Sequence, residues 1–87
     1  MKMLVLYHVN NEHATNVEGF VKSIKEHSSR DVELISLETE EGASVANTYG
    51  IVNYPASLII RDDGQLLKYW EGDVLPLVGE VAGYLNS

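Results

Sequence analysis

The 87-residue sequence predicts an α/β fold in which three helices flank a four-stranded mixed sheet. Two fully apolar runs predict strands that are covered on both faces, and apolar stripes at helical spacing predict helices between and after them. An Asp-Gly pair between two apolar runs predicts a hairpin turn. The resulting order is βαβαββα, and we expect residues 1–87 to form a single domain because a chain of this length supports one core.

The first half of the chain has the pattern of strand, helix and strand. Residues 3–7 form a continuous apolar run, and residues 32–37 mix apolar and polar side chains in the manner of an edge strand. Between them, apolar residues recur at helical spacing. These residues are Val17, Phe20, Val21 and Ile24. We expect Asn11 or Thr15 to cap this helix, which should end near His27.

The second half begins with a short helix and a hairpin. Residues 43–49 predict the helix, which Gly50 ends in a left-handed conformation, and the acidic residues 38–41 are expected to precede it. Residues 56–60 are the second fully apolar run, and the Asp62-Asp63-Gly64 turn joins them to a strand over residues 65–70. The two apolar strands therefore belong at the centre of the sheet, and the two more polar strands belong at its edges.

A third helix is expected at the end of the chain. Asp73 should cap it, and Pro76 is tolerated in a first turn. Its buried stripe would be Leu77, Val78, Val81, Ala82 and Leu85.

The composition excludes several classes of partner. Six Lys and Arg residues against 13 Asp and Glu give a formal charge of -7, which leaves no basic stripe for phosphates. We therefore expect neither a nucleic-acid nor a membrane partner. The N-terminal apolar run is too short for a signal-peptide core, so a cytoplasmic location is expected.

Three features of the sequence occur in a characteristic order. They are Ala46-x-x-Tyr49-Gly50-Ile51-x-x-x-Pro55, Asp63-Gly64 followed by Gly72, and a first strand that leads into a polar loop and a helix. In these features the chain resembles the thioredoxin-like superfamily in its minimal form, over nearly its whole length. The resemblance implies a single thioredoxin-like domain, a cis peptide bond before Pro55, and a substrate peptide that pairs with the main chain of Tyr54.

The sequence departs from that family at the Cys-x-x-Cys motif. Alignment of the helix start places Asn11 and Ala14 on the two cysteine positions, with Glu12 and His13 between them, and the chain contains no cysteine. Thiol–disulfide exchange needs a thiolate that attacks a disulfide, and neither an amide nor a methyl group replaces it. We therefore predict no catalytic residue and no cofactor, and favour a protein that is not an enzyme.

The candidate site comprises these degenerate positions and a putative binding loop formed by Tyr54, Pro55, Ala56 and His8. The polar side chains that follow the first strand should gather at its carboxyl end, the usual ligand edge of an open α/β sheet. They are His8, Asn10, Asn11, Glu12 and His13. The competing interpretation is a solvated loop that caps a helix. The histidine spacing of this segment matches no strong metal motif, so we predict no metal site.

Several functions stay open. The leading hypothesis is a non-catalytic domain that binds a peptide or protein segment at the Pro55 loop. The alternative is an oxidoreductase lineage whose cysteines at positions 11 and 14 are lost or replaced. Weaker alternatives are an enzyme that uses Ser57, Tyr7 or Tyr54, and a structural role as a homo-oligomer that associates through its edge strands. The expected state is a monomer or a weak homodimer. Trp70 is expected either in the core or as an anchor for a partner.

Overall fold

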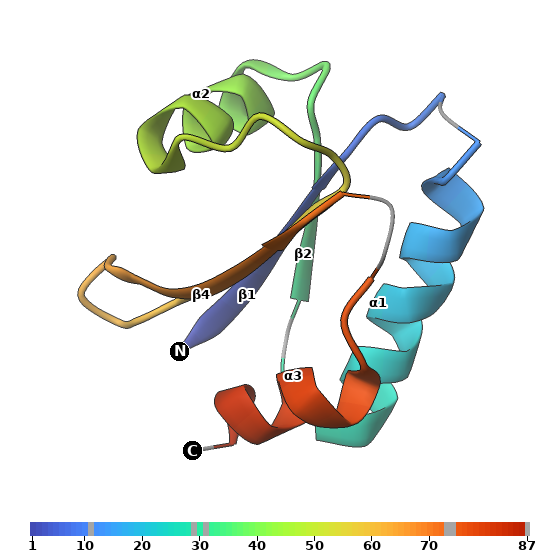
Figure 1. The fold of residues 1–87 in the computed structure, drawn as a ribbon, viewed down its shortest axis with the longest axis vertical. Helices are drawn as coiled ribbons and strands as arrows, with labels where there is room; N and C mark the ends of the chain where they lie inside the picture. The colour runs from blue at the N-terminus through green and yellow to red at the C-terminus, as the bar shows by residue number, and fades with distance from the viewer. Residues whose placement is uncertain (11, 29, 31, 73–74, 87) are drawn as a thin grey trace.

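Seven elements follow one another in the order βαβαββα in the computed structural model, which describes residues 1–10, 12–28, 30, 32–72 and 75–86. They are β1 (Lys2–Tyr7), α1 (Ala14–Ser28), β2 (Val32–Ser36), α2 (Glu40–Tyr49), β3 (Ala56–Ile60), β4 (Leu66–Glu71) and α3 (Val78–Leu85). Figure 1 shows their arrangement around one mixed sheet. The predicted fold class and element order are confirmed.

The four strands lie in the order β2-β1-β3-β4. β1 is parallel to β2 and antiparallel to β3, which is in turn antiparallel to β4. The two mainly apolar strands β1 and β3 are therefore central, and the more polar strands β2 and β4 are at the edges, as predicted. Burial on both faces explains why β1 and β3 carry continuous apolar runs where a half-exposed strand would alternate.

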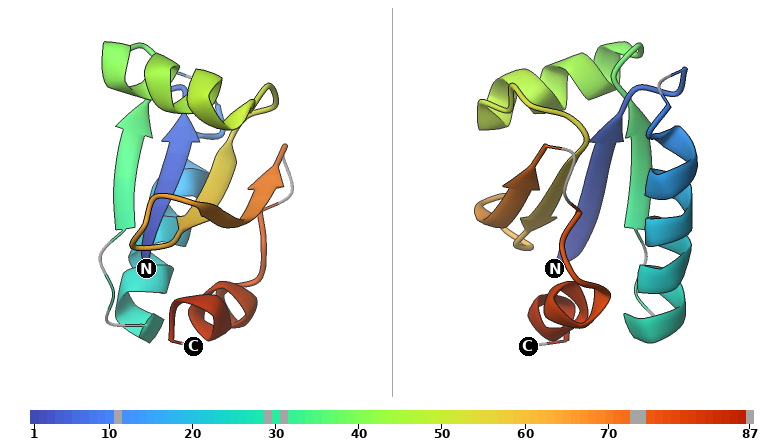
Figure 2. Two further views of the ribbon diagram at one scale, coloured as in Figure 1. Left: turned by 90° about the vertical axis from the view of Figure 1, so that its left-hand side faces the viewer. Right: turned by 45° about the vertical axis from the view of Figure 1, so that its right-hand side comes forward.

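Each face of the sheet has its own hydrophobic core. Met3 and Val5 point to the face that α1 and α3 cover, whereas Leu4 and Leu6 point to the face that α2 covers. Figure 2 shows α2 on one side of the sheet and the other two helices on the opposite side. None of the described helices is both long and apolar enough to cross a bilayer.

Trp70 of β4 is held within the fold. Its indole ring meets Tyr84 of α3 edge to face, with ring centroids 5.9 Å apart, and its Nε1 donates to the Glu80 carboxylate over 2.9 Å. The ring also packs against the core on the α1 and α3 face. Of the two roles expected for Trp70, the structure supports packing between β4 and α3.

One end of each of the four strands lies at the same end of the sheet, across the strand direction, and we call this end of the sheet the site edge. Tyr7 and Ser36 are neighbours at the ends of β1 and β2, and Ala56 at the start of β3 pairs with Leu6 and with Glu71. The opposite edge carries the turn between β3 and β4. Gly64 of that turn has φ of +90°, which confirms the predicted Asp-Gly hairpin. β4 begins at Leu66, one residue later than expected, because Asp63 accepts the hydrogen bond of the Gln65 N–H.

The prediction that α2 begins at residue 43 is wrong. The helix starts at Glu40, because the Thr39 hydroxyl accepts the Gly42 N–H over 3.0 Å and caps it. Glu40 and Glu41, which we had placed before the helix, form its first turn, where their charges favour the positive end of the helix dipole. Gly50 ends α2 with φ of +67°, as predicted.

The expected starts of the other two helices also need correction. Thr15 cannot cap α1 because it lies inside the helix, which begins at Ala14, and Asn11 is outside the described residues. Pro76 precedes α3 and is not in its first turn, since the helix begins at Val78 after an N-cap residue Leu77 that makes no side-chain cap bond. Asp73 is outside the described residues.

Candidate functional site

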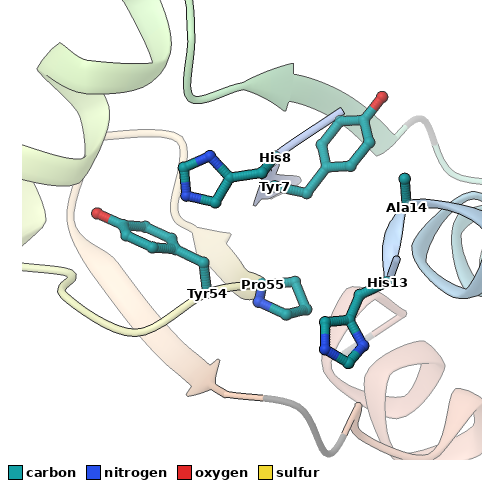
Figure 3. A pocket seen from close by; sticks show the side chains of 6 residues that line it. All are labelled: Tyr7, His8, His13, Ala14, Tyr54 and Pro55. Carbon is teal, nitrogen blue, oxygen red and sulfur yellow. The ribbon is translucent and has the colours of Figure 1, made fainter. Parts of the chain in front are cut away.

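Two loops meet at the site edge and enclose a small hollow. One loop follows β1 and leads into α1, and the other joins α2 to β3. The hollow measures about 200 Å³ including its open mouth, with room for little more than one water molecule. It is lined by Tyr7, His8, His13, Ala14, Tyr54 and Pro55 (Figure 3). A drug-sized ligand needs a cavity of about 300–1,000 Å³. The small hollow is therefore better suited to contact with a polypeptide segment that lies across the surface than to enclosing a small molecule.

The structure brings most of the predicted site residues together, although not all of them. His8, His13, Ala14, Tyr54 and Pro55 line the hollow. Ala56 is fully buried in the core on the α2 face, Glu12 points into solvent with 88% of its side chain exposed, and Asn11 is outside the described residues. Tyr7 is an addition to the predicted site.

Tyr54 is held in place by its side chain. Its hydroxyl donates to the Ile51 carbonyl over 2.8 Å, and its ring meets the His8 imidazole edge to face with centroids 5.5 Å apart. The peptide bond that follows it, to Pro55, is cis. The Pro55 carbonyl accepts the Gly72 N–H over 3.0 Å, which ties this loop to the end of β4.

The main chain of Tyr54 is left open. Within the described ranges, neither its N–H nor its C=O takes part in a hydrogen bond. A main-chain donor and acceptor at the end of a strand are the groups that an added strand of another chain uses. The apolar side chains Val9 and Val52, which lie in the two loops, are 42% and 75% exposed.

A carboxylate of the β2–α2 loop organises His8. The Glu38 Oε1 atom lies 3.0 Å from His8 Nδ1, and its Oε2 accepts the Ser36 hydroxyl over 2.6 Å. The hydroxyl of Ser36 and, to a smaller extent, the imidazole of His8 lower the pKa of Glu38 from 4.5 to about 2. Glu38 is therefore ionised throughout the physiological range. Glu38 was expected only as part of an acidic stretch before the second helix, and the parallel pairing of β1 with β2 reveals its neighbours.

A second, wider hollow lies on the α2 side of the His8 and Tyr54 rings. It encloses about 630 Å³ and is open to solvent. Its lining residues are His8, Leu37, Ala43, Ala46, Asn47, Ile51 and Tyr54. Because His8 and Tyr54 belong to both hollows, the two form one continuous surface. We call the second hollow the α2 groove.

Neither Ser36 nor Ser57 is placed as an activated nucleophile. The Ser36 hydroxyl is bonded to a carboxylate whose pKa is about 2, and so weak a base does not activate a hydroxyl. Ser57, another candidate nucleophile, is only 1% exposed, and its hydroxyl has no partner within the described residues. Among the same residues no three His, Asp or Glu side chains gather as a metal site would require.

The start of α1 carries the other half of the predicted site. Ala14 is the first residue of the helix, and it lines the hollow opposite Pro55. A cysteine here would sit at the positive end of the helix dipole, where a thiolate is stabilised. The methyl group of Ala14 offers neither a nucleophile nor a metal ligand. Without any cysteine, this chain has no group that attacks a disulfide.

Comparison with solved structures identifies the architecture. The chain is similar to thioredoxin 1 from the thermophilic eubacterium Thermosipho africanus TCF52B, with a TM-score of 0.71 over 99% of this chain and 91% of that one. Its fold is that of thioredoxin. Sequence identity to this thioredoxin is 15%, and a second structure, described as that of a malarial protein, has a TM-score of 0.69 with 8% identity over 97% and 91% of the two chains. No family model and no curated protein matches the sequence.

The comparison supports the thioredoxin-like fold and leaves the function of the site edge to be argued from its own residues. The expectation from the sequence, a thioredoxin-like chain that lacks the Cys-x-x-Cys motif, is confirmed at the level of fold. Sequence identities of 15% and 8% support a shared architecture alone. Any function must therefore be argued from the residues at the site edge.

Proposed function

We propose that this chain is a non-catalytic thioredoxin-like domain that binds an extended peptide segment at the site edge. The observation that carries the proposal is the main chain of Tyr54, whose N–H and C=O make no hydrogen bond within the described residues. An extended segment that lies beside Tyr54 would complete both bonds in the manner of an added strand. This mode of binding uses main-chain groups and needs no cysteine.

The surroundings of Tyr54 support a preformed site. The Ile51 carbonyl and the His8 ring hold its side chain, so little conformational freedom is lost when a segment binds beside it. Val52, on the same loop, exposes three quarters of its side chain. An exposed valine next to an open main chain gives the segment apolar surface to cover.

A matched pair of substitutions tests this proposal. We would select octapeptides from a random displayed library and measure their affinities for the wild-type chain, Val52→Ser and Leu77→Ser. Val52 and Leu77 are 75% and 76% exposed, but only Val52 lies in the loop that carries Tyr54, whereas Leu77 is the residue before α3. Loss of a buried valine contact costs about 1–1.5 kcal/mol, so Val52→Ser should weaken binding about tenfold while Leu77→Ser leaves it unchanged.

Amide chemical shifts locate the binding surface independently. Saturable shifts at residues 7–10, 12–14 and 51–54 of the labelled protein are expected when a selected peptide is added. Equal loss of affinity in both serine variants, or shifts confined to the opposite edge of the sheet, would contradict the proposal.

A second candidate function rests on the position of Ala14. It occupies the first position of α1 and faces Pro55, which suits an oxidoreductase lineage whose cysteines are lost or replaced. The double substitution Asn11→Cys with Ala14→Cys should then restore disulfide reductase activity in an insulin reduction assay. A folded but inert double variant would count against this lineage, and the Ala14→Cys single variant is the control because one thiol cannot complete the cycle.

A further inference from the structure

The α2 groove lies where a side chain of the bound segment would point. Successive side chains of an extended segment alternate between its two sides. The small hollow and the α2 groove lie on opposite sides of the His8 and Tyr54 rings and share both residues as walls. A segment that pairs with the main chain of Tyr54 would therefore direct one side chain into the groove and its neighbours away from it.

The floor of the groove is apolar. Leu37, Ala46 and Ile51 contribute hydrocarbon, and Ala46 and Ile51 also belong to the core beneath. The polar groups on its walls are largely occupied, since the Tyr54 hydroxyl donates to Ile51 and His8 Nδ1 lies against Glu38. The inner part of the groove thus suits a long hydrocarbon stem.

The rim of the groove is acidic. Glu38 follows the lining residue Leu37 directly and stays ionised because the Ser36 hydroxyl lowers the pKa of its carboxyl. Glu40 and Glu41 are exposed in the first turn of α2, the helix that supplies the groove with Ala43 and Ala46. A Glu38 carboxylate that already has two partners still has free lone pairs for a cation.

No Lys or Arg of this chain lies at the site edge beside these charges. The chain has six Lys and Arg residues. They lie at the start of β1, in the second half of α1 and just after it, in the β3–β4 turn and within β4, at Lys2, Lys22, Lys25, Arg30, Arg61 and Lys68. The acidic rim is therefore complementary in charge to a basic partner.

We propose that the α2 groove receives a lysine or arginine side chain of the bound segment. Its aliphatic stem would lie on Leu37, Ala46 and Ile51, and its cationic head would reach Glu38 at the rim. This assignment rests on the proposed peptide binding and adds the chemistry of the segment to it. Lys and Arg are the side chains that combine a long apolar stem with a charged head.

Peptides that differ at one position test the charge. The strongest octapeptide from the random library that contains a Lys or Arg would be compared with versions that carry norleucine or Glu at that position. We expect the basic peptide to bind about two- to fivefold more tightly than the norleucine version, as for a solvent-exposed ion pair, and the Glu version to bind most weakly. Added salt should reduce the difference between the basic and norleucine peptides.

Protein variants locate the charge at the groove. Glu38→Gln should weaken the basic peptide two- to fivefold and leave the norleucine peptide unchanged, because an amide oxygen can still accept from Ser36. Glu26→Gln removes the same charge from the exposed surface of α1, outside the groove, and should affect neither peptide.

The possible results separate the two proposals. If the norleucine peptide binds as tightly as the basic one and Glu38→Gln has no effect, the cationic assignment is overturned while peptide binding stands. If selected peptides lack enrichment in Lys and Arg, the same conclusion follows. If no peptide binds at all, the proposed function fails and this inference fails with it.

Discussion

The site edge and the opposite edge of the sheet differ in whether their polar groups form hydrogen bonds within the chain. At the opposite edge, the turn between β3 and β4 is closed by internal bonds, because the Tyr49 hydroxyl donates to the Gly64 carbonyl over 2.9 Å and Gly64 N–H donates to Arg61 over 2.9 Å. At the site edge, the N–H and C=O of Tyr54 make no bond within the described residues. The polar groups of the turn are therefore bonded within the fold, whereas these two main-chain groups of Tyr54 are not.

Acidic and basic residues are also distributed unevenly between the site edge and the rest of the fold. The site edge carries Glu12, Glu38 and Glu71 with no Lys or Arg beside them, and the basic residues lie elsewhere in the fold. A fold does not require this segregation, since interspersed charges would be equally soluble. Under the proposed function, this segregation of charge would favour a basic segment at the site edge, and three pairs of substitutions test the difference between the two edges.

The largest effect is expected at Gly42, where α2 crosses the end of β2. A Cβ atom on this residue would lie 2.1 Å from the Ser36 carbonyl oxygen, so helix and strand must separate to admit it. Gly42→Ala should lower the free energy of unfolding by about 2–3 kcal/mol, measured by urea denaturation. Gly19 of α1 is the matched control, because nothing lies within 4 Å of the added atom.

Gly19→Ala should instead raise stability by about 0.5–1 kcal/mol, since alanine loses less conformational freedom in a helix. If the two alanine variants had the same stability, the close packing of α2 on the site edge would be refuted.

A smaller effect should distinguish two tyrosines that bond to main-chain carbonyls. Tyr54→Phe removes a partly buried bond to Ile51 at the site edge, and Tyr49→Phe removes an exposed bond to Gly64 at the opposite edge. Loss of the first should cost about 1 kcal/mol of stability and loss of the second about 0.5 kcal/mol. Only Tyr54→Phe should also weaken peptide binding, because it loosens the loop that presents the main chain; equal effects of both changes on affinity would contradict this.

The smallest effect concerns the titration of Glu38. Its pKa of about 2 in the folded chain lies below the ordinary 4.5, so its contacts with Ser36 and His8 stabilise the fold above pH 4.5. This contribution is lost as the pH falls from about 4.5 towards 2. Ser36→Ala should raise the pKa more than His8→Ala does, as followed by the side-chain carboxyl carbon resonance in an NMR titration.

A Glu38 that titrates near 4.5 in the wild-type chain would show that the bond to Ser36 does not persist in solution.

The fold was predictable because its strongest signals are local. The apolar runs of β1 and β3 record burial on both faces, and the Asp63-Gly64 pair requires a tight turn. The start of α2 was not predicted, because a run of glutamates resembles a loop when it is considered without its cap. Thr39, which supplies that cap, was the available signal, with two first-turn carboxylates behind it.

The site was predictable only in part, for a topological reason. His8 and His13 were expected beside the Pro55 loop because they follow the first strand and the resemblance to thioredoxins places that loop nearby. The link between His8 and Glu38 spans 30 residues and exists because β2 is parallel to β1. Side chains that meet through sheet pairing leave no periodic trace in the sequence, which is why the acidic rim of the α2 groove was missed.

Trp70 also decides what can be observed spectroscopically. It is the one tryptophan of the chain, and it lies between β4 and α3 with its indole bonded to Glu80. Its emission therefore reports the docking of the last helix on the hairpin, on the side of the sheet away from the α2 groove. Tryptophan fluorescence and the amide signals of residues 51–54 thus act as two separate reporters, one for helix docking and one for occupancy of the groove.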